Sequence, residues 1–190
     1  MKISIITILC IAILATNGYA TVNRHPFTNY FETVYIDSGK HLLRVNVNNT
    51  DEFVVAEGTE IIGWYAFGSC REITSVIIPD SVTNIMRSAF STCYALTNIV
   101  IGSGVREIGD LAFYACWRLE KIELPDSLEK VGEGTFIGCR FPQGLKIGSG
   151  LRDVGIDAFR DNTYTITISE SNQWLRVENN KVVSIRKEEE

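Results

Sequence analysis

Four evenly spaced cysteines are the residues in this sequence with the clearest potential for chemistry. Cys70, Cys93, Cys116 and Cys139 follow one another at intervals of 23 residues. Four cysteines in a secreted protein normally form two disulfides, and neighbouring coils of a stacked repeat fall within the ~4.4–6.8 Å Cα separation that a disulfide needs. One cysteine per coil, however, gives a column of parallel side chains in which each thiol acts as a small buried apolar group. We therefore expect free buried thiols, with disulfides between neighbouring coils as the alternative.

Other arrangements that support catalysis or metal binding are missing from the sequence. The two histidines, His25 and His41, lie outside the evenly spaced region, so a Cys–His or Ser–His dyad needs one of them folded against a nucleophile. The cysteines lack the close Cys or His spacing of a zinc site. Gly-Ser-Gly at 102–104 and 148–150 is typical of turns. We expect no enzyme activity, no cofactor and no metal.

A surface column with the same spacing is a better candidate for a functional site, and its chemistry is binding. It is predicted on the outward side of extended segments and changes from apolar to polar along the chain: Val54, Ile77 and Val100, then Glu123, Lys146 and Ser169. Contiguous exposed apolar surface usually marks contact with another molecule, although β-branched residues also favour strands for their own sake. The candidate binding residues are Val54, Ile77, Val100, Asn98, Lys121, Glu123 and Lys146.

A second column follows each cysteine by one residue and consists of aromatic and basic side chains: Arg71, Tyr94, Trp117 and Arg140. Stacked on successive coils, such side chains make aromatic and cation–π contacts worth about 0.5–1 kcal/mol each at an exposed site. We favour a structural role for this ladder. A ligand platform is the alternative, because Trp, Tyr and Arg are also the residues enriched at interface hot spots.

All these columns belong to one repeat with a period of 23 residues. Its clearest column is aromatic: Phe67, Phe90, Phe113, Phe136 and Phe159. A second column is predicted to face inward from a strand: Val76, Ile99, Ile122, Leu145 and Ile168. A fixed period of about 20–29 residues with a Cys column is typical of a leucine-rich-repeat solenoid. In such a solenoid the inward columns stack into one continuous core.

Within each coil the local pattern predicts a strand, a turn, a second short strand and a short helical or irregular segment. Residues 96–101 (LTNIVI) alternate inward and outward positions, as a strand does. Residues 112–119 place apolar groups at i, i+3 and i+6, which suits a helical turn. We therefore predict an α/β-type repeat solenoid of about five to six coils of 23 residues. A parallel sheet forms one face, helical or irregular turns form the other, and a cap closes each end.

The expected division of the chain into segments begins with a signal peptide, which indicates a protein outside the cell. Residues 1–20 resemble a signal peptide, because Lys2 precedes an apolar run at 3–15 and Gly18-Tyr19-Ala20 suits signal peptidase. The run is shorter than the roughly 20 residues of a membrane helix. We assign 21–40 to an N-terminal cap, 41–168 to the solenoid and 169–190 to a capping hairpin with an acidic tail. The protein is expected to be secreted or peripheral at the cell surface, with Asn48 as a glycosylation site in a eukaryote.

Charge excludes one class of partner. The net charge of the chain is −5 and no clustered basic face is evident, whereas nucleic-acid binding requires one. We therefore expect no nucleic-acid partner.

The repeated segments VIIPDSVTNIMRSAFSTCYALTNI and IELPDSLEKVGEGTFIGC also resemble the BspA-like leucine-rich repeats. The resemblance covers roughly residues 53–168. It implies a secreted or surface protein of bacteria or host-associated protists that takes part in adhesion and binds host proteins. The leading expectation is therefore binding of an extracellular or host protein through the sheet face of the solenoid. The alternative is a structural protein that associates with itself into a surface coat and has no distinct ligand.

Overall fold

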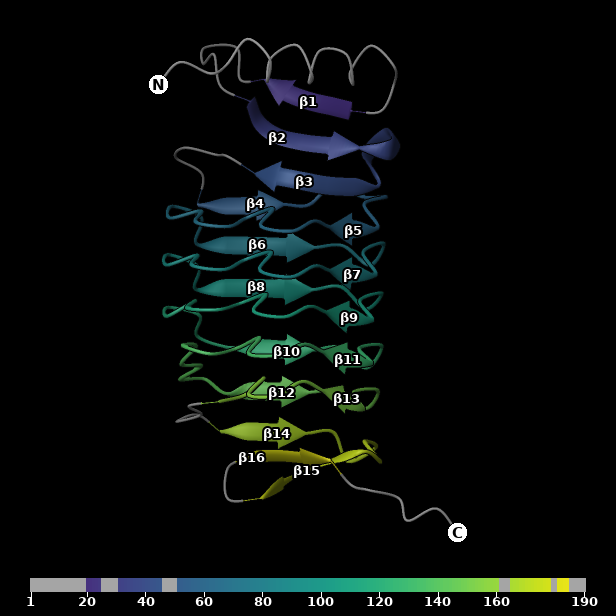
Figure 1. Cartoon of the computed structure of the whole chain (residues 1–190), viewed down its shortest axis with the longest axis vertical. Coiled ribbons are helices and arrows are strands. Elements are labelled where there is room, and N and C mark those ends of the chain that lie inside the picture. The colour runs from purple at the N-terminus through teal and green to yellow at the C-terminus, as the bar shows by residue number, and fades with distance from the viewer. Residues whose placement is uncertain (1–19, 25–30, 46–50, 161–164, 179–180, 185–190) are drawn as a thin grey trace.

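The chain folds into a parallel β-solenoid of about five turns with coils of about 23 residues. The structure is a computed structural model, and it describes residues 20–24, 31–45, 51–160, 165–178 and 181–184. Figure 1 shows two stacks of short strands running side by side along the axis. The strands of the first stack are β3 (His41–Val45), β5 (Ile61–Ile62), β7 (Asn84–Ile85), β9 (Glu107–Ile108), β11 (Lys130–Val131) and β13 (Asp153–Val154).

The second stack carries the longer strand of each coil, and we call its outward side the strand face. Its two three-stranded parallel sheets are β4 (Glu52–Val54), β6 (Ser75–Ile78) and β8 (Asn98–Ile101), followed by β10 (Ile122–Leu124), β12 (Leu145–Ile147) and β14 (Ile166–Ile168). β8 and β10 contact each other, so the two sheets follow one another along the same side (Figure 1). From β4 to β8 and from β10 to β12 the registers pair residues 23 apart, such as Val76 with Ile99. The predicted parallel sheet is therefore confirmed.

The core is a stack of phenylalanine rings, one from each coil. Adjacent rings in the series Phe67, Phe90, Phe113, Phe136 and Phe159 lie 4.5–5.5 Å apart between centroids and 3–16° from parallel. All five side chains are buried. Nearly parallel rings at this separation are offset-stacked, and each such pair adds about 0.5–1.5 kcal/mol to the energy of burial. The aromatic column predicted from the sequence is therefore the centre of the solenoid.

The segments that connect β5 to β6, and the equivalent segments of later coils, are irregular turns, one of the two forms expected, and not helical ones. We call these segments the arms; among the described residues they contain turns and no α-helix. Ser88 and Thr92 have φ values of 56° and 62°, in the left-handed region, and their N–H groups donate to the next coil, to Asp110 O (2.9 Å) and Tyr114 O (2.8 Å). An α-helix needs those N–H groups for bonds to the residue four positions earlier. Bonding between coils therefore replaces helical bonding.

The last coil shifts the predicted strand column. Spacing by 23 places Ile168 beside Leu145, but the register pairs Leu145 with Ile166 and Ile147 with Ile168. The outward neighbour of Lys146 is accordingly Thr167, so the assignment of Ser169 to this column was wrong. A shift of two residues preserves the alternation of the strand, and the inward positions therefore remain apolar.

Antiparallel strands flank the parallel stacks at both ends. β1 (Ala20–Arg24) and β2 (Phe31–Ile36) pair antiparallel with each other, and β2 pairs with β3. At the other end β15 (Leu175–Glu178) pairs antiparallel with β16 (Lys181–Ser184). Several expected features fall outside the described residues: most of the signal segment, Asn48, residues 179–180 of the expected hairpin and the acidic tail.

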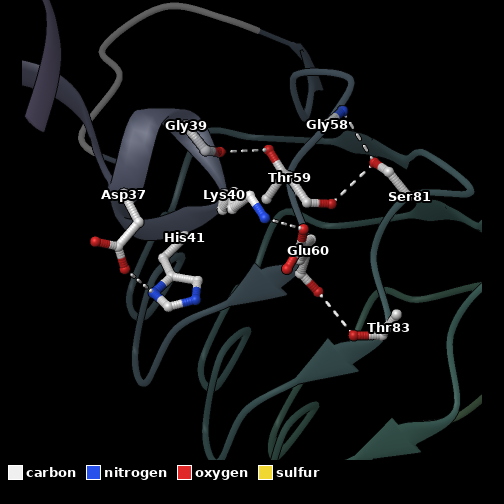
Figure 2. A network of polar contacts seen from close by, with 9 residues as sticks. All are labelled: Asp37, Gly39, Lys40, His41, Gly58, Thr59, Glu60, Ser81 and Thr83. Carbon is white, nitrogen blue, oxygen red and sulfur yellow. Dashed lines mark hydrogen bonds and ion pairs between the residues drawn. The ribbon is translucent and has the colours of Figure 1, made fainter. Parts of the chain in front are cut away.

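A network of polar contacts joins the N-terminal strands to the first coils (Figure 2). The 3-10 turn η1 (Asp37–Gly39) precedes β3, and Lys40 at its end forms an ion pair with Glu60 at 2.8 Å. Thr59 donates to the carbonyl of Gly39 at 3.3 Å, while its own carbonyl accepts from Ser81 at 2.9 Å. These contacts link residues about one coil apart, so they connect the segment that precedes β3 to the first coils.

Candidate functional site: the strand face and two hollows

The structure brings the predicted apolar residues of the strand face into one column. Val54 pairs with Ile77, and Ile77 pairs with Val100. Val54 and Val100 are 58% and 49% exposed, and Ile77 between them is half-buried. Three β-branched side chains therefore form a continuous apolar stripe on the outward side of β4, β6 and β8.

The stripe leads into a charged region on the next sheet. Glu123 pairs with Lys146 in the register, and the carboxylate and ammonium groups lie 3.6 Å apart. Both side chains are largely exposed, so this ion pair contributes little to folding. A hollow of about 450 Å³ opens here, and we call it the sheet hollow. Its lining residues are Ile101, Glu123, Leu124, Pro125, Asp126, Lys146, Ile147, Gly148, Thr167 and Ser169.

The other two predicted binding residues lie on the same face, two positions before the column. Asn98 precedes Val100 in β8 and donates from Nδ2 to Ser75 Oγ at 3.2 Å. Lys121 is exposed and precedes Glu123. Residues two apart in a strand point to the same side. Asn98 and Lys121 therefore flank the central column.

The aromatic and basic ladder lies on the arms. The Tyr94 and Trp117 rings are 5.0 Å apart between centroids and tilted by 34°, and Trp117 remains 56% exposed. Arg71 and Arg140 are exposed at the equivalent positions of the flanking coils. A ring contact between successive coils fits the structural role that we favoured, although half of the Trp117 surface stays open to solvent.

A second hollow is lined mostly by residues that the sequence analysis did not single out, Cys70 and Arg71 excepted, and we call it the arm hollow. It measures about 520 Å³ and is lined by Leu43, Arg44, Val45, Trp64, Tyr65, Gly68, Ser69, Cys70, Arg71 and Glu72. Trp64 and Tyr65 are among the most exposed large side chains in the described part of the chain, at 67% and 62%. The repeat column of Trp64 contained a sequence signal for this hollow. The equivalent positions in later coils are Arg87, Asp110, Glu133 and Ile156. An aromatic residue in a mostly charged column is unusual for a purely structural position.

The four evenly spaced cysteines form a column of free thiols, in which Cys70 is half-buried and Cys93, Cys116 and Cys139 are buried. The Sγ atoms of Cys93, Cys116 and Cys139 each donate to the carbonyl of a core phenylalanine one coil earlier, at 3.1–3.2 Å. The hydrogen bond with the Cys116 thiol, together with burial, raises the pKa of Cys93. Burial raises the pKa of Cys70 to about 12. Because the thiolate is the reactive form, the raised pKa values keep Cys70 and Cys93 in the unreactive thiol form at neutral pH.

Thiol labelling tests the state of this column. At pH 8 only on the order of one Cys70 in ten thousand is a thiolate, and its neighbours are more deeply buried. We expect the native protein to react very slowly with a chromogenic disulfide reagent, and Cys70, Cys93, Cys116 and Cys139 all to react once guanidinium unfolds it without reductant. Peptide mapping of the labelled chain assigns each thiol. Cysteines that stay unlabelled after unfolding would show that disulfides form instead.

His41 occupies a position consistent with a structural contact. Its Nδ1 lies 3.0 Å from Asp37 Oδ2, within the network that joins the N-terminal strands to the first coils (Figure 2). The other histidine, His25, falls outside the described residues. Among the residues that the structure describes, no group of three or more His, Cys, Asp and Glu side chains is placed to hold a metal ion.

The outward side of the first stack is occupied by charges that pair with each other. Glu129 bonds both Arg106, at 3.1 Å, and Arg152, one coil on either side. In the adjacent column Lys130 bonds Glu107 at 3.2 Å. This side exposes paired charges, whereas the strand face exposes Val54 and Val100 and the arm hollow exposes Trp64 and Tyr65. The strand face and the arm hollow are therefore the stronger candidates for binding.

Comparison with known proteins identifies the repeat. A family model described as "BspA type Leucine rich repeat region" matches residues 46–178 in six copies. A leucine-rich repeat protein of T. pallidum is 22% identical, with a TM-score of 0.60, over 79% of this chain and 68% of that one. A leucine-rich repeat protein of Eubacterium ventriosum is also 22% identical, with a TM-score of 0.63, over 80% of this chain and 45% of that one.

The pneumococcal vaccine antigen PcpA shares the fold as well. It is 17% identical with a TM-score of 0.59, and the match covers 88% of this chain and 54% of that one. The chain therefore spans about half the length of the Eubacterium protein and of PcpA. Among curated proteins, none matches significantly. The described residues include no helix long and apolar enough to cross a membrane.

Proposed function

Because the chain belongs to the BspA-type leucine-rich repeat family, we propose that it is a non-catalytic protein that binds an extracellular or host protein through its strand face. The family is typically non-catalytic, and the solenoid presents an extended surface of stacked strands. The expected signal segment at residues 1–20 supports a place outside the cell or at its surface. The likeness to a vaccine antigen concerns the fold alone.

The observation that carries this proposal is the column on the strand face. Its exposed apolar part, Val54, Ile77 and Val100, is continuous with the Glu123–Lys146 pair and the sheet hollow. Burial of exposed apolar area contributes roughly 25 cal/mol per Å², while polar groups around it give orientation and specificity. Such a combination of an apolar centre and a polar rim is what protein interfaces use.

A charge introduced into the apolar stripe tests the proposal. Val100 is 49% exposed, so Val100→Glu is compatible with folding, whereas a carboxylate buried against a partner without a counter-charge is costly. We expect Val100→Glu to weaken binding to a partner by tenfold or more. The measurement is surface plasmon resonance against a panel of immobilised extracellular-matrix and plasma proteins.

A matched control separates the site from general surface charge. Ile156→Glu introduces the same charge at a β-branched residue that is 76% exposed and lies on an arm. This variant is expected to bind as well as the unmodified protein. Equal binding by Val100→Glu and the unmodified protein, or an equal loss in both variants, would remove the strand face as the binding surface.

A further inference from the structure

The arm hollow lies beside the first coil, which is shorter than the coil that follows. Leu42 pairs with Ile62 and Phe53 pairs with Val76, so eleven residues lead from Leu42 to Phe53, whereas fourteen lead from Ile62 to Val76. This segment of the first coil is therefore three residues shorter than its equivalent in the next coil.

Apolar and aromatic side chains stand open at this hollow. Its volume of about 520 Å³ lies within the range of about 300–1,000 Å³ that is usual for ligand sites. Trp64 and Tyr65 are 67% and 62% exposed, and Leu43 on the opposite strand is 42% exposed. Aromatic side chains supply much contact area at a small entropic cost. Their exposure at one concave place therefore indicates that a ligand with an apolar group covers them.

The same hollow is locally cationic in an acidic protein. Its lining contains Arg44 and Arg71 and one acidic residue, Glu72, while the net charge of the whole chain is −5. Burial raises the pKa of the Cys70 thiol, and the positive charge of Arg44 acts in the opposite direction, which places the guanidinium near this part of the lining. Guanidinium groups form strong, frequently bidentate hydrogen bonds with carboxylates. The charge of the hollow is thus complementary to an acidic ligand.

We propose that the arm hollow binds an acidic peptide segment of a partner protein. Its carboxylates bond Arg44 and Arg71, and an apolar side chain of the segment lies against Trp64 and Tyr65. Tyrosine, tryptophan and arginine together are the residues that dominate protein interfaces. This second contact uses residues that lie outside the strand face. It therefore does not depend on the function proposed above. Two separated contacts on one partner raise the overall affinity by their effective concentration.

Fluorescence anisotropy with defined peptides tests this proposal on the full chain. The probe is a labelled peptide of alternating glutamate and leucine, and the comparison peptide replaces each glutamate by glutamine. We expect the acidic peptide to bind with a dissociation constant that rises with salt, because the contact is charge-assisted. The glutamine peptide is expected to bind at least tenfold more weakly. Equal binding of the two peptides, or no binding of the acidic peptide, would overturn the proposal.

The repeat supplies matched control variants on other coils. Arg71→Glu and Trp64→Ala change the arm hollow, whereas Arg140→Glu and Trp117→Ala change exposed side chains on later arms. We expect the first two to weaken peptide binding by at least tenfold and the last two to change it by less than twofold. Circular dichroism verifies that all four variants keep their β-structure. Equal losses for Arg71→Glu and Arg140→Glu would show binding to general surface charge and contradict the proposal.

An anionic sugar is the other class of ligand whose carboxylates suit Arg44 and Arg71. One further titration distinguishes such a sugar from a peptide. A uronic-acid oligosaccharide is tested with the unmodified protein and with Trp64→Ala. Binding of this oligosaccharide through Trp64, without binding of the acidic peptide, would overturn the assignment to a peptide. Peptide binding without oligosaccharide binding is the result that we expect.

Discussion

Replacing Phe113 by alanine is expected to lower the free energy of unfolding by about 3–5 kcal/mol, the usual cost of removing a buried phenylalanine. Phe113 is fully buried, and its ring stacks on Phe90 at 5.1 Å and on Phe136 at 5.5 Å. The substitution therefore removes two ring contacts and leaves a cavity in the middle of the core. Guanidinium denaturation followed by circular dichroism measures the change.

The adjacent residue provides the control for this prediction. Tyr114 follows Phe113 in the same arm but is 40% exposed, so Tyr114→Ala is expected to cost far less than Phe113→Ala. If the two variants were equally stable, the phenylalanine column would not be the core of the solenoid, and the register of all coils would need revision.

Gly104→Ala is the second substitution with a large expected effect. A Cβ atom at Gly104 overlaps the backbone carbonyl of Asp80 in the preceding coil. Neither backbone can move away, because both belong to stacked coils whose strands are paired. We expect a loss of about 3 kcal/mol or more, at the upper end of what overpacking costs. Thermal and guanidinium denaturation measure it.

Ser103→Ala is the matched control at the same corner. Ser103 is exposed, and its contact with Asp80 uses its backbone N–H, at 2.6 Å from Asp80 Oδ1, which alanine retains. The substitution is expected to change stability by less than about 0.5 kcal/mol, as is usual for surface positions. A Gly104→Ala variant as stable as Ser103→Ala would mean that the corners of adjacent coils are not in close contact.

The turns at Gly104 and at the equivalent positions of other coils, which we call corners, show which features a single repeat predicts and which depend on neighbouring coils. The sequence alternates Pro-Asp-Ser (79–81, 125–127) with Gly-Ser-Gly (102–104, 148–150), and both predicted turns. The structure adds that each glycine corner packs against a proline corner: a Cβ at Gly102 would lie 2.5 Å from the Pro79 carbonyl oxygen. That contact lies between coils and depends on how they stack. A turn motif read by itself does not contain it.

The core and strands were predictable because residues 23 positions apart have the same role in successive coils. Phe113 and the other members of the phenylalanine column are an example. The arms were less predictable, since apolar groups at i, i+3 and i+6 fit a helix as well as a turn with inward side chains. Residues with left-handed backbone conformation favour the turn over the helix. The N–H of Ser88, for example, donates to the carbonyl of Asp110 in the next coil. Likewise the pairing of Leu145 with Ile166 follows from the length of the last coil and not from the period.

The candidate site divides in the same way. The stripe of Val54, Ile77 and Val100 lies where strand alternation placed it. The arm hollow was missed, because it is formed by residues of two different coils, 43–45 and 64–72, that come together only in the folded chain. Departures from a repeat column are therefore the sequence signal to examine for function in such a solenoid, while agreement with the column indicates the core.

The central claim is that the strand face binds a different protein and is not covered by a second copy of the chain. Light scattering on the secreted protein at several concentrations, coupled to size-exclusion chromatography, tests this claim most directly. We predict the mass of one chain at every concentration, for the unmodified protein and for Val100→Glu alike. A mass that rises with concentration and returns to that of one chain in Val100→Glu would contradict the claim, and would favour a surface coat built by self-association.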